Sequence, residues 1–267
     1  MEGFGMKGTL TEHQRAMADR VLDEESRHRA HLVVSLSGAH AYGFPSPDSD
    51  LDLKSIHVAH TAALLTLQPV HVPTERLEVL EGVEVDYSSN ELLPVLQGIL
   101  QGNGNYLERV LGAIPLRVSP ELESLRPLVR AVLSRKMYRH YNGFAQGQLR
   151  EWEKSGFRSA KRLLYVLRTT LTGTHALRTG VVETDVTELL SQYGFVEAHA
   201  LVEQKLRGEK SELPEALSAR WRGEVSRAFE VLEAARADSV LPESPPDEAV
   251  AALEAWMLDL RRRRFDG

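Results

Sequence analysis

Two aspartates, Asp50 and Asp52, stand where a turn-rich segment gives way to an alternating apolar and polar run over 51–59. Side chains at positions i and i+2 of a β-strand point to the same face, so both carboxylates would project together. Adjacent carboxylates repel each other unless a cation neutralises them, and Mg²⁺ is a hard cation that takes oxygen ligands. We therefore expect Asp50 and Asp52 to be catalytic and to bind Mg²⁺ or Mn²⁺.

A third carboxylate, Asp86, lies in the apolar run 82–87, which has the composition of a short strand. If neighbouring strands bring Asp86 alongside the pair, the three groups are typical of a two-metal centre for phosphoryl transfer. One ion would activate an attacking hydroxyl, and the other would hold a triphosphate and steady the leaving pyrophosphate. Asp86 would ligate the first ion or accept the hydroxyl proton. The alternative is that these aspartates are solvated, since Asp is common beside turns.

The residues that lead into the aspartate pair favour contact with phosphate. Ser37 and Gly38 end a β-branched run over 31–36, and a segment rich in Gly, Pro, Ser and Asp follows them. Gly38 would let the backbone approach a phosphate closely, and the N–H groups of such a loop can cradle an anion. We therefore expect this loop to bind a triphosphate.

Hydrophobic periodicity predicts the elements that must position these side chains. Strands are expected over 31–36, 51–59 and 82–87, and helices over 9–30 (with Thr11 as N-cap) and 90–101. Helical spacing dominates the rest of the chain, over 120–137, 138–154, 158–173, 184–193, 195–208, 213–237 and 246–264. Gly and Pro separate most of these helices, and Gly173 is expected to end one of them. The sequence thus predicts an α+β fold, with a mixed-sheet domain over 1–117 and a helical domain over 118–267.

Composition and charge narrow the functional classes. The 267 residues include no cysteine, which excludes disulfides, thiolate metal sites and a cysteine nucleophile. The formal net charge is −6, so a surface for nucleic acid must be a local patch, and Arg135, Lys136 and Arg139 form the best candidate. No segment has the apolar length of a signal peptide core or a membrane span, so we expect a cytoplasmic protein without a membrane partner.

The segment SGAHAYGFPSPDSDLDLK at 37–54 resembles the signature of the DNA polymerase β-like nucleotidyltransferase superfamily. That signature joins an apolar strand, a glycine turn and an Asp-apolar-Asp/Glu element to a later apolar-Asp-apolar element, which VDY at 85–87 matches. More narrowly, the chain is similar to a predicted nucleotidyltransferase family often encoded beside RNA ligases. Members also carry a Gly-Asn-x-Asn…Glu element and a Lys…Arg helix, which GNGNYLE at 102–108 and KRLLYVLR at 161–168 match.

The resemblance implies a set of nucleotide-binding residues on two segments. They are Ser37, Gly38, Ala39, His40, Tyr42 and Ser49 in the loop, and Lys161, Tyr165 and Arg168 on the helix. Lys161 and Arg168 would share one helical face and reach the triphosphate from a helical domain that closes the nucleotide cleft. The alternative for this pair is a solvated basic face. Members usually have Ser where this chain has Ala39, and its loss would weaken nucleotide binding.

The resemblance also implies the reaction. The enzyme would transfer NMP from an NTP, with ATP the expected substrate, to a hydroxyl acceptor and release pyrophosphate. Because members of this family are often encoded beside RNA ligases, the resemblance implies an RNA end in repair or processing as the acceptor. Two alternatives stay open: nucleotidylation of a protein or small molecule, and a non-catalytic nucleotide-binding module, which Ala39 would favour. The sequence assigns neither the oligomeric state nor a role for 181–267.

Overall fold

The computed structural model describes residues 10–67, 74–112, 114–208 and 211–265. The chain divides into two compact units. We call them the sheet unit (the described residues of 10–37, 50–133 and 244–265) and the helical unit (the described residues of 38–49 and 134–243). None of the helices in these described ranges is both long and apolar enough to cross a bilayer.

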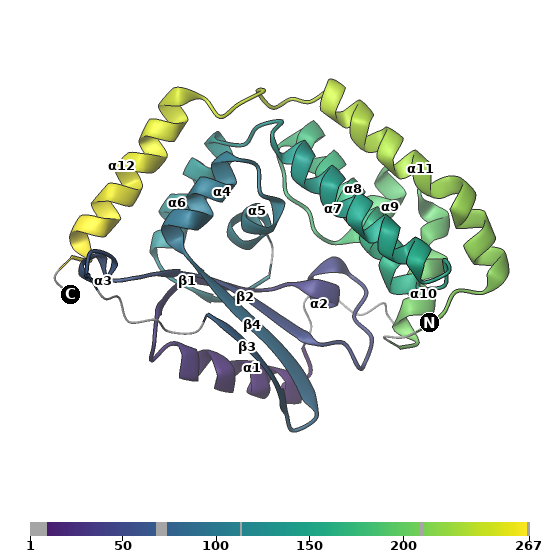
Figure 1. Cartoon of the computed structure of the whole chain (residues 1–267), viewed down its shortest axis with the longest axis horizontal. Coiled ribbons are helices and arrows are strands. Elements are labelled where there is room, and N and C mark those ends of the chain that lie inside the picture. The colour runs from purple at the N-terminus through teal and green to yellow at the C-terminus, as the bar shows by residue number, and fades with distance from the viewer. Residues whose placement is uncertain (1–9, 68–73, 113, 209–210, 266–267) are drawn as a thin grey trace. The chain divides into compact units, whose positions relative to one another are not determined.

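A five-stranded mixed sheet forms the centre of the sheet unit, in the order β3-β4-β2-β1-β5 (Figure 1). The strands are β1 (Ala30–Leu36), β2 (Leu51–Val58), β3 (Glu75–Leu80), β4 (Val83–Glu91) and β5 (Pro115–Val118). The β2–β4 pair is parallel, and the other three pairs are antiparallel. β1, β2 and β4 confirm the three expected strands, whereas β3 and β5 are additional to them.

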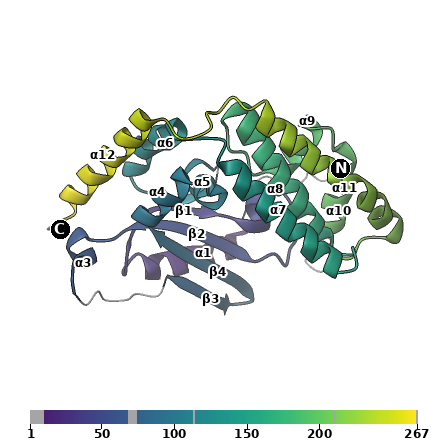
Figure 2. The ribbon, with the colours of Figure 1, turned by 45° about the horizontal axis from the view of Figure 1, so that its top comes forward.

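Helices cover both faces of this sheet (Figures 1 and 2). On one face lies α1 (Glu12–Glu25), whose buried Leu22 packs in the same core as Leu51, Leu53 and Val85 of the strands. Thr11 caps α1 as expected, because its side chain accepts the Gln14 N–H in a capping box. The remaining helices of the unit are α3 (Thr61–Leu64), α4 (Leu92–Leu100), α5 (Gly104–Leu111), α6 (Glu121–Ala131) and α12 (Asp247–Arg263), with α4 and α5 on the face opposite α1.

The helical unit is built around α8 (Ala160–Thr179), against which α7, α9, α10 and α11 pack. Its other helices are α2 (Gly38–Tyr42), α7 (Met137–Lys154), α9 (Val186–Gln192), the 3₁₀ turn Val196–Ala198, α10 (His199–Leu206) and α11 (Glu215–Ala237). The expectation that Gly173 ends a helix is wrong. Gly173 is buried inside α8, and the helix ends at Gly180, which adopts the left-handed conformation with φ 73°.

The α+β class, with a mixed sheet in the N-terminal part and helices in the C-terminal part, is confirmed. The two units nevertheless follow a different partition from the expected division at 117/118. The loop Gly38–Ser49 belongs with the helices, and α6 and α12 belong with the sheet. The physical reason is packing, because α6 lies against α5 and β1 and α12 lies against α6.

Candidate active site

The parallel pairing of β2 and β4 brings two of the three predicted carboxylates together. Asp52 lies directly opposite Asp86, and Leu51 lies opposite Val85. Leu51 and Val85 are fully buried in the core under α1. Because strand side chains alternate between faces, Asp52 and Asp86 project from the opposite face of the sheet. The expectation that a neighbouring strand brings Asp86 alongside the aspartate pair therefore holds for Asp52.

A lysine that the sequence reasoning did not select lies between these carboxylates. Lys54 Nζ is 2.8 Å from Asp86 Oδ2 and 3.5 Å from Asp52 Oδ1. Lys54 stands two residues after Asp52 on β2, so strand alternation places both side chains on the same face. That spacing was the signal that could have found it. Asp50, which was expected on the strand, lies just before it.

Burial raises the pKa of the Asp52 carboxyl above its usual value, and the neighbouring charges of Asp86 and Asp50 raise it further. The Lys54 ammonium opposes this shift, because it stabilises the charged form of the carboxylate. The charges of Asp50 and Asp86 thus both act on the Asp52 carboxyl. Their repulsion is relieved in the structure by a cationic side chain.

The donor chemistry of this cluster suits Mg²⁺ or Mn²⁺. Asp52 and Asp86 offer hard oxygen ligands, and a cationic group, the Lys54 ammonium, already lies against both. Within the described ranges, no three His, Cys, Asp or Glu side chains are gathered closely enough to hold a metal ion. Binding by Asp50, Asp52 and Asp86 thus stays a prediction. It would require the Lys54 ammonium to yield its place, with substrate oxygens completing the ligand set.

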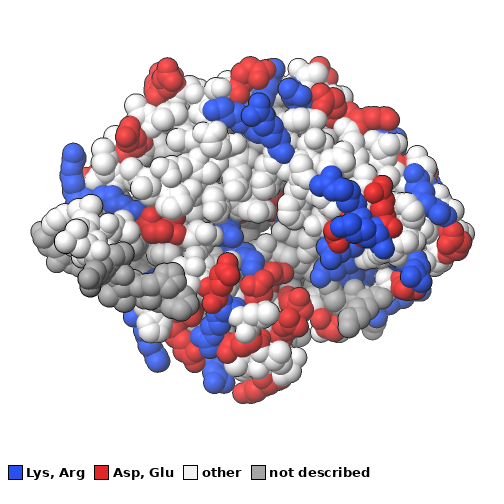
Figure 3. All heavy atoms as spheres, in the orientation of Figure 1, with Lys and Arg blue, Asp and Glu red and all other residues white. Residues whose placement is uncertain are grey.

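A hollow of about 400 Å³ opens beside the carboxylates on the same face. It is lined by Lys54, Asp86 and Ser88 together with Glu75, Arg76 and Leu77 of the edge strand β3. Figure 3 shows acidic and basic side chains intermixed over the β3–β4 end of the sheet. The hollow therefore presents both charges to a ligand, next to the groups that would bind a metal ion.

The loop that was expected to cradle phosphate begins as a single helical turn, α2. Ser37 closes β1 by donating its N–H to the Asp52 carbonyl at 2.9 Å, and Gly38 then adopts a positive φ of 59°. Ala39, His40 and Tyr42 are all buried in the turn. The sequence reasoning did not foresee this helix, because its residues lie between two turn-forming segments.

The predicted residues of α8 gather around Tyr42 inside the helical unit. The Arg168 guanidinium lies over the Tyr42 ring, with Cζ 3.6 Å from the ring centroid, and is buried. The Tyr165 ring packs edge-on against Tyr42 with the centroids 5.6 Å apart, and Lys161 Nζ lies 6.0 Å from the Tyr165 centroid. A solvated basic face therefore does not describe Arg168. The geometry brings Tyr42, Lys161, Tyr165 and Arg168 into one cluster.

Lys205, which was not among the residues predicted from the sequence, holds the end of the loop by hydrogen bonds. Lys205 is fully buried on α10, and its Nζ donates to Ser46 Oγ at 2.6 Å and lies 3.3 Å from Ser49 Oγ. Ser49 immediately precedes Asp50, so Lys205 anchors the chain just before the predicted metal ligands. Its position after Leu201 and Val202, on the apolar stripe of the helix, was the available signal.

The basic patch proposed for nucleic acid is partly structural. Arg135 donates to the Leu241 and Ser239 carbonyls at 2.9 and 3.1 Å and to Glu243 Oε1 at 2.8 Å, and so holds the segment after α11. Burial and the charge of Arg168 lower the pKa of the neighbouring His140 to about 4, so it adds no positive charge at pH 7. Lys136 is partly exposed and Arg139 is exposed. Their contact with nucleic acid stays a prediction.

Comparison with known proteins identifies the family. Residues 13–259 match the RNA repair pathway DNA polymerase beta family. The chain belongs to this family. Membership confirms the resemblance drawn from the 37–54 motif and supports a nucleotidyltransferase role.

Two individual proteins give more limited matches. An uncharacterized protein of Methanocaldococcus jannaschii is 29% identical over 156 residues, which cover 58% of this chain and 63% of that protein. The match thus spans less than two thirds of the relative's length. The crystal structure of a nucleotidyltransferase-like protein from Exiguobacterium sibiricum aligns with a TM-score of 0.32 and 10% identity, covering 93% of this chain and 80% of that one.

Proposed function

We propose that the chain transfers NMP from an NTP to a hydroxyl acceptor and releases pyrophosphate, in a reaction that depends on Mg²⁺ or Mn²⁺. The observation that carries the proposal is the pairing of Asp52 with Asp86 across parallel strands, with a cationic group against both. Family membership supports the same chemistry. A divalent cation held there would activate the attacking hydroxyl and stabilise the charge that develops on the phosphates.

Each predicted carboxylate, the neighbouring Lys54 and the predicted loop have a task in this reaction. Asp50 and Asp52 would hold the cation, and Asp86 would orient the acceptor hydroxyl and accept its proton. Lys54, once displaced from between the carboxylates, would supply a positive charge to the triphosphate. The N–H groups near Ser37 and Gly38 would bind phosphate oxygens, with Ala39, His40 and Ser49 shaping the loop.

The cluster on α8 would complete the nucleotide site. Arg168 stacks on Tyr42, and its planar guanidinium would make a bidentate contact with phosphate. Lys161 would add a point charge, and Tyr165 would stack on the base or support the cluster. ATP is the nucleotide we propose, with an RNA end as the acceptor. The description of the family as part of an RNA repair pathway supports that acceptor.

The experiment follows label from α-³²P ATP, GTP, CTP and UTP with Mg²⁺ or Mn²⁺, in the presence and absence of RNA. Wild type is compared with Asp52→Asn and Asp86→Asn, and with Asp259→Asn as the matched control. Asp259 is an exposed carboxylate of α12 that pairs with Arg263 one helical turn away. We expect transfer by the wild type and the control, and none above background by the two site variants.

The destination of the label decides the acceptor. Label in RNA supports the proposal in full. Label in the protein itself or in a small product would keep the reaction and replace the acceptor. If the wild type binds NTP and Mg²⁺ but transfers nothing to any acceptor, the chain is a non-catalytic nucleotide-binding module. If Asp52→Asn transfers label at the wild-type rate, the assignment of the carboxylates is wrong.

A further inference from the structure

A second pocket, of about 580 Å³, lies in the sheet unit at the other end of β2 from Asp52. It includes His57, which is five residues from Asp52 along the strand, a separation of about 16 Å at the usual rise. The odd numbering of His57 places it on the face of Leu51 and Leu53, opposite the carboxylates. The pocket is therefore distinct from the candidate active site in both position and face.

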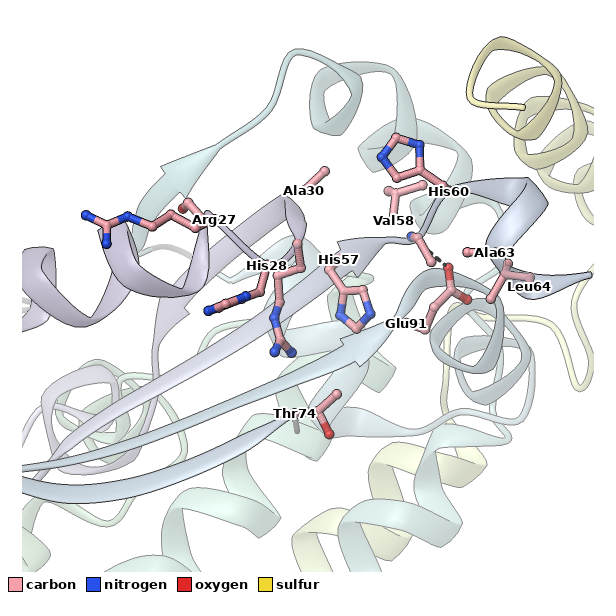
Figure 4. Close-up of a pocket in the computed structure, with 13 residues that line it drawn as sticks. Arg27, His28, Ala30, His57, Val58, His60, Ala63, Leu64, Thr74 and Glu91 are labelled. Atoms are coloured by element: carbon pink, nitrogen blue, oxygen red, sulfur yellow. Dashed lines mark hydrogen bonds between the residues drawn. The ribbon is translucent and has the colours of Figure 1, made fainter. Parts of the chain in front are cut away.

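The polar groups around this pocket are mainly cationic or imidazole side chains. In Figure 4, Arg27 and His28 lie on one side of His57 and His60 and Glu91 on the other, with the Arg27 guanidinium pointing outward and the His60 ring on the opposite side of the strand from the His57 ring. Arg27, His28 and His60 are exposed, so their side chains can move onto a ligand. The His57 ring is held in place, because its Nδ1 lies 2.7 Å from Ser89 Oγ.

The acidic residue of the pocket is already neutralised. Glu91 Oε2 accepts the Leu93 N–H at 2.8 Å at the start of α4, and Oε1 pairs with the Arg261 guanidinium. The negative charge of Glu91 is therefore offset within the protein by a helix N-terminus and an arginine. A second arginine of the lining, Arg29, lies 3.1 Å from the Glu25 carboxylate beside the pocket. What remains for a ligand is an excess of hydrogen-bond donors and the positive charge of Arg27.

Part of the pocket lining is apolar. Val58 at the end of β2 and Ala63 and Leu64 of α3 contribute it. A pocket that combines an apolar wall with a cluster of cationic and imidazole donors, at a volume within about 300–1,000 Å³, suits a small ligand that carries an anion on an apolar body. Guanidinium and imidazole groups bind phosphate oxygens with charge-assisted hydrogen bonds.

We infer that this pocket binds the phosphomonoester of a nucleotide, with the phosphate against Arg27, His57 and His60 and the nucleoside against the Val58–Leu64 wall. The inference is independent of the proposed catalytic function, because none of its residues serves that site. The same chemistry could come from a free mononucleotide or from the 5′-phosphorylated end of an oligonucleotide. The experiment separates these two sources.

The test measures binding of AMP by isothermal titration calorimetry, with adenosine as the ligand that lacks phosphate. Wild type is compared with the double variant Arg27→Gln/His60→Gln, and with Arg220→Gln on α11 as the matched charge control. Asp52→Asn/Asp86→Asn reports whether AMP binds at the carboxylates instead. Thermal unfolding verifies that the double variant is folded, as its exposed positions predict.

We expect the double variant to bind AMP at least about tenfold more weakly than wild type, the loss of one charge-assisted contact. The Arg220→Gln variant should bind AMP as the wild type does. Weaker AMP binding by the carboxylate variant, with unchanged binding by the double variant, would place AMP at the candidate active site and overturn the inference. A 5′-phosphorylated trinucleotide that competes with AMP, while its 5′-hydroxyl form does not, assigns the pocket to a strand end. AMP binding without such competition assigns it to a free nucleotide. Equal binding of adenosine and AMP, unchanged AMP affinity in the double variant, or no AMP binding at millimolar concentration overturns the inference.

Discussion

Replacing Gly173 by alanine tests the packing that holds the predicted nucleotide-binding helix in place. Gly173 is buried in the middle of α8, where that helix crosses α7 and α11. A Cβ added at this position would lie 2.7 Å from Tyr141 Cβ, 2.8 Å from Tyr141 Cγ and 3.0 Å from Leu232 Cδ1. Tyr141 Cβ is fixed to the α7 backbone, so α7 and α8 must move apart to admit the methyl group.

Two opposing contributions to the free energy of unfolding decide whether Gly173→Ala stabilises or destabilises the protein. Alanine favours a helix interior over glycine by about 1 kcal/mol. Overpacking a tight core costs about 1–3 kcal/mol, and contacts this short with fully buried Tyr141 and Leu232 place Gly173→Ala at the upper end of that range. The net expectation is a loss of about 1–2 kcal/mol in the free energy of unfolding. For a chain of this size, that loss lowers Tm by about 2–8 °C.

The same substitution at two exposed helical glycines supplies the control. Apart from the chain neighbours and the nearby backbone of its own helix, a Cβ at Gly143 on α7 or at Gly223 on α11 would have no atom within 4 Å. Gly143→Ala and Gly223→Ala should therefore raise the free energy of unfolding, by about 0.5–1 kcal/mol each. Urea unfolding followed by circular dichroism measures all three variants. A Gly173→Ala protein as stable as the wild type would refute the close approach of α7 and α8.

Three further predictions address the cap, the stack and the buried histidines. Thr11→Ala should lower the free energy of unfolding by about 1 kcal/mol in urea, because it removes the cap of α1; no loss would contradict the cap. Arg168→Lys keeps the charge but removes the planar stack on Tyr42, so a loss of about 1–2 kcal/mol is expected, and an unchanged urea midpoint would contradict it. Burial lowers the pKa of His31 and of His57 to about 4, so the unfolded chain takes up protons first and stability should fall as pH drops from about 6.5 towards 4. Equal free energies of unfolding at pH 7.5 and 5.5 would contradict this.

Regular periodicity made most of the fold predictable. β1, β2 and β4 are apolar or alternating runs, and α1 carries a capping signal at Thr11 that the structure bears out. β3 was not predicted from the sequence. It is an edge strand in which Leu77 and Val79 are exposed at 71% and 67%, so it lacks a buried apolar face with the usual alternation. The prediction that Gly173 ends a helix was wrong, because in the sequence a buried glycine at a tight helix crossing cannot be told from a glycine at a helix end.

The candidate site was predictable where it depended on strand alternation and less so where it depended on tertiary contact. Alternation placed Asp52 on an open face, and the parallel register with Asp86 followed once the strands paired. The burial of Arg168 over Tyr42 depends on contacts between residues far apart in the chain, which no local spacing reveals. The same holds for Arg135, whose partners after α11 turn a candidate ligand-binding residue into a structural one.

The position of Lys54 depends both on strand alternation and on tertiary contact. The carboxylates on this face of adjacent strands must meet two requirements. Their mutual repulsion must be offset for the chain to fold, and they must carry negative charge to bind a cation. The lysine meets the first requirement, because its ammonium lies against Asp52 and Asp86. We propose that it meets the second because its side chain is part-exposed, so that a divalent cation arriving with a triphosphate would displace it towards the phosphates. On this proposal the same residue would offset the charges of Asp52 and Asp86 and would then bind the triphosphate. The strand alternation that places Asp52 on this face of the sheet also places Lys54 there.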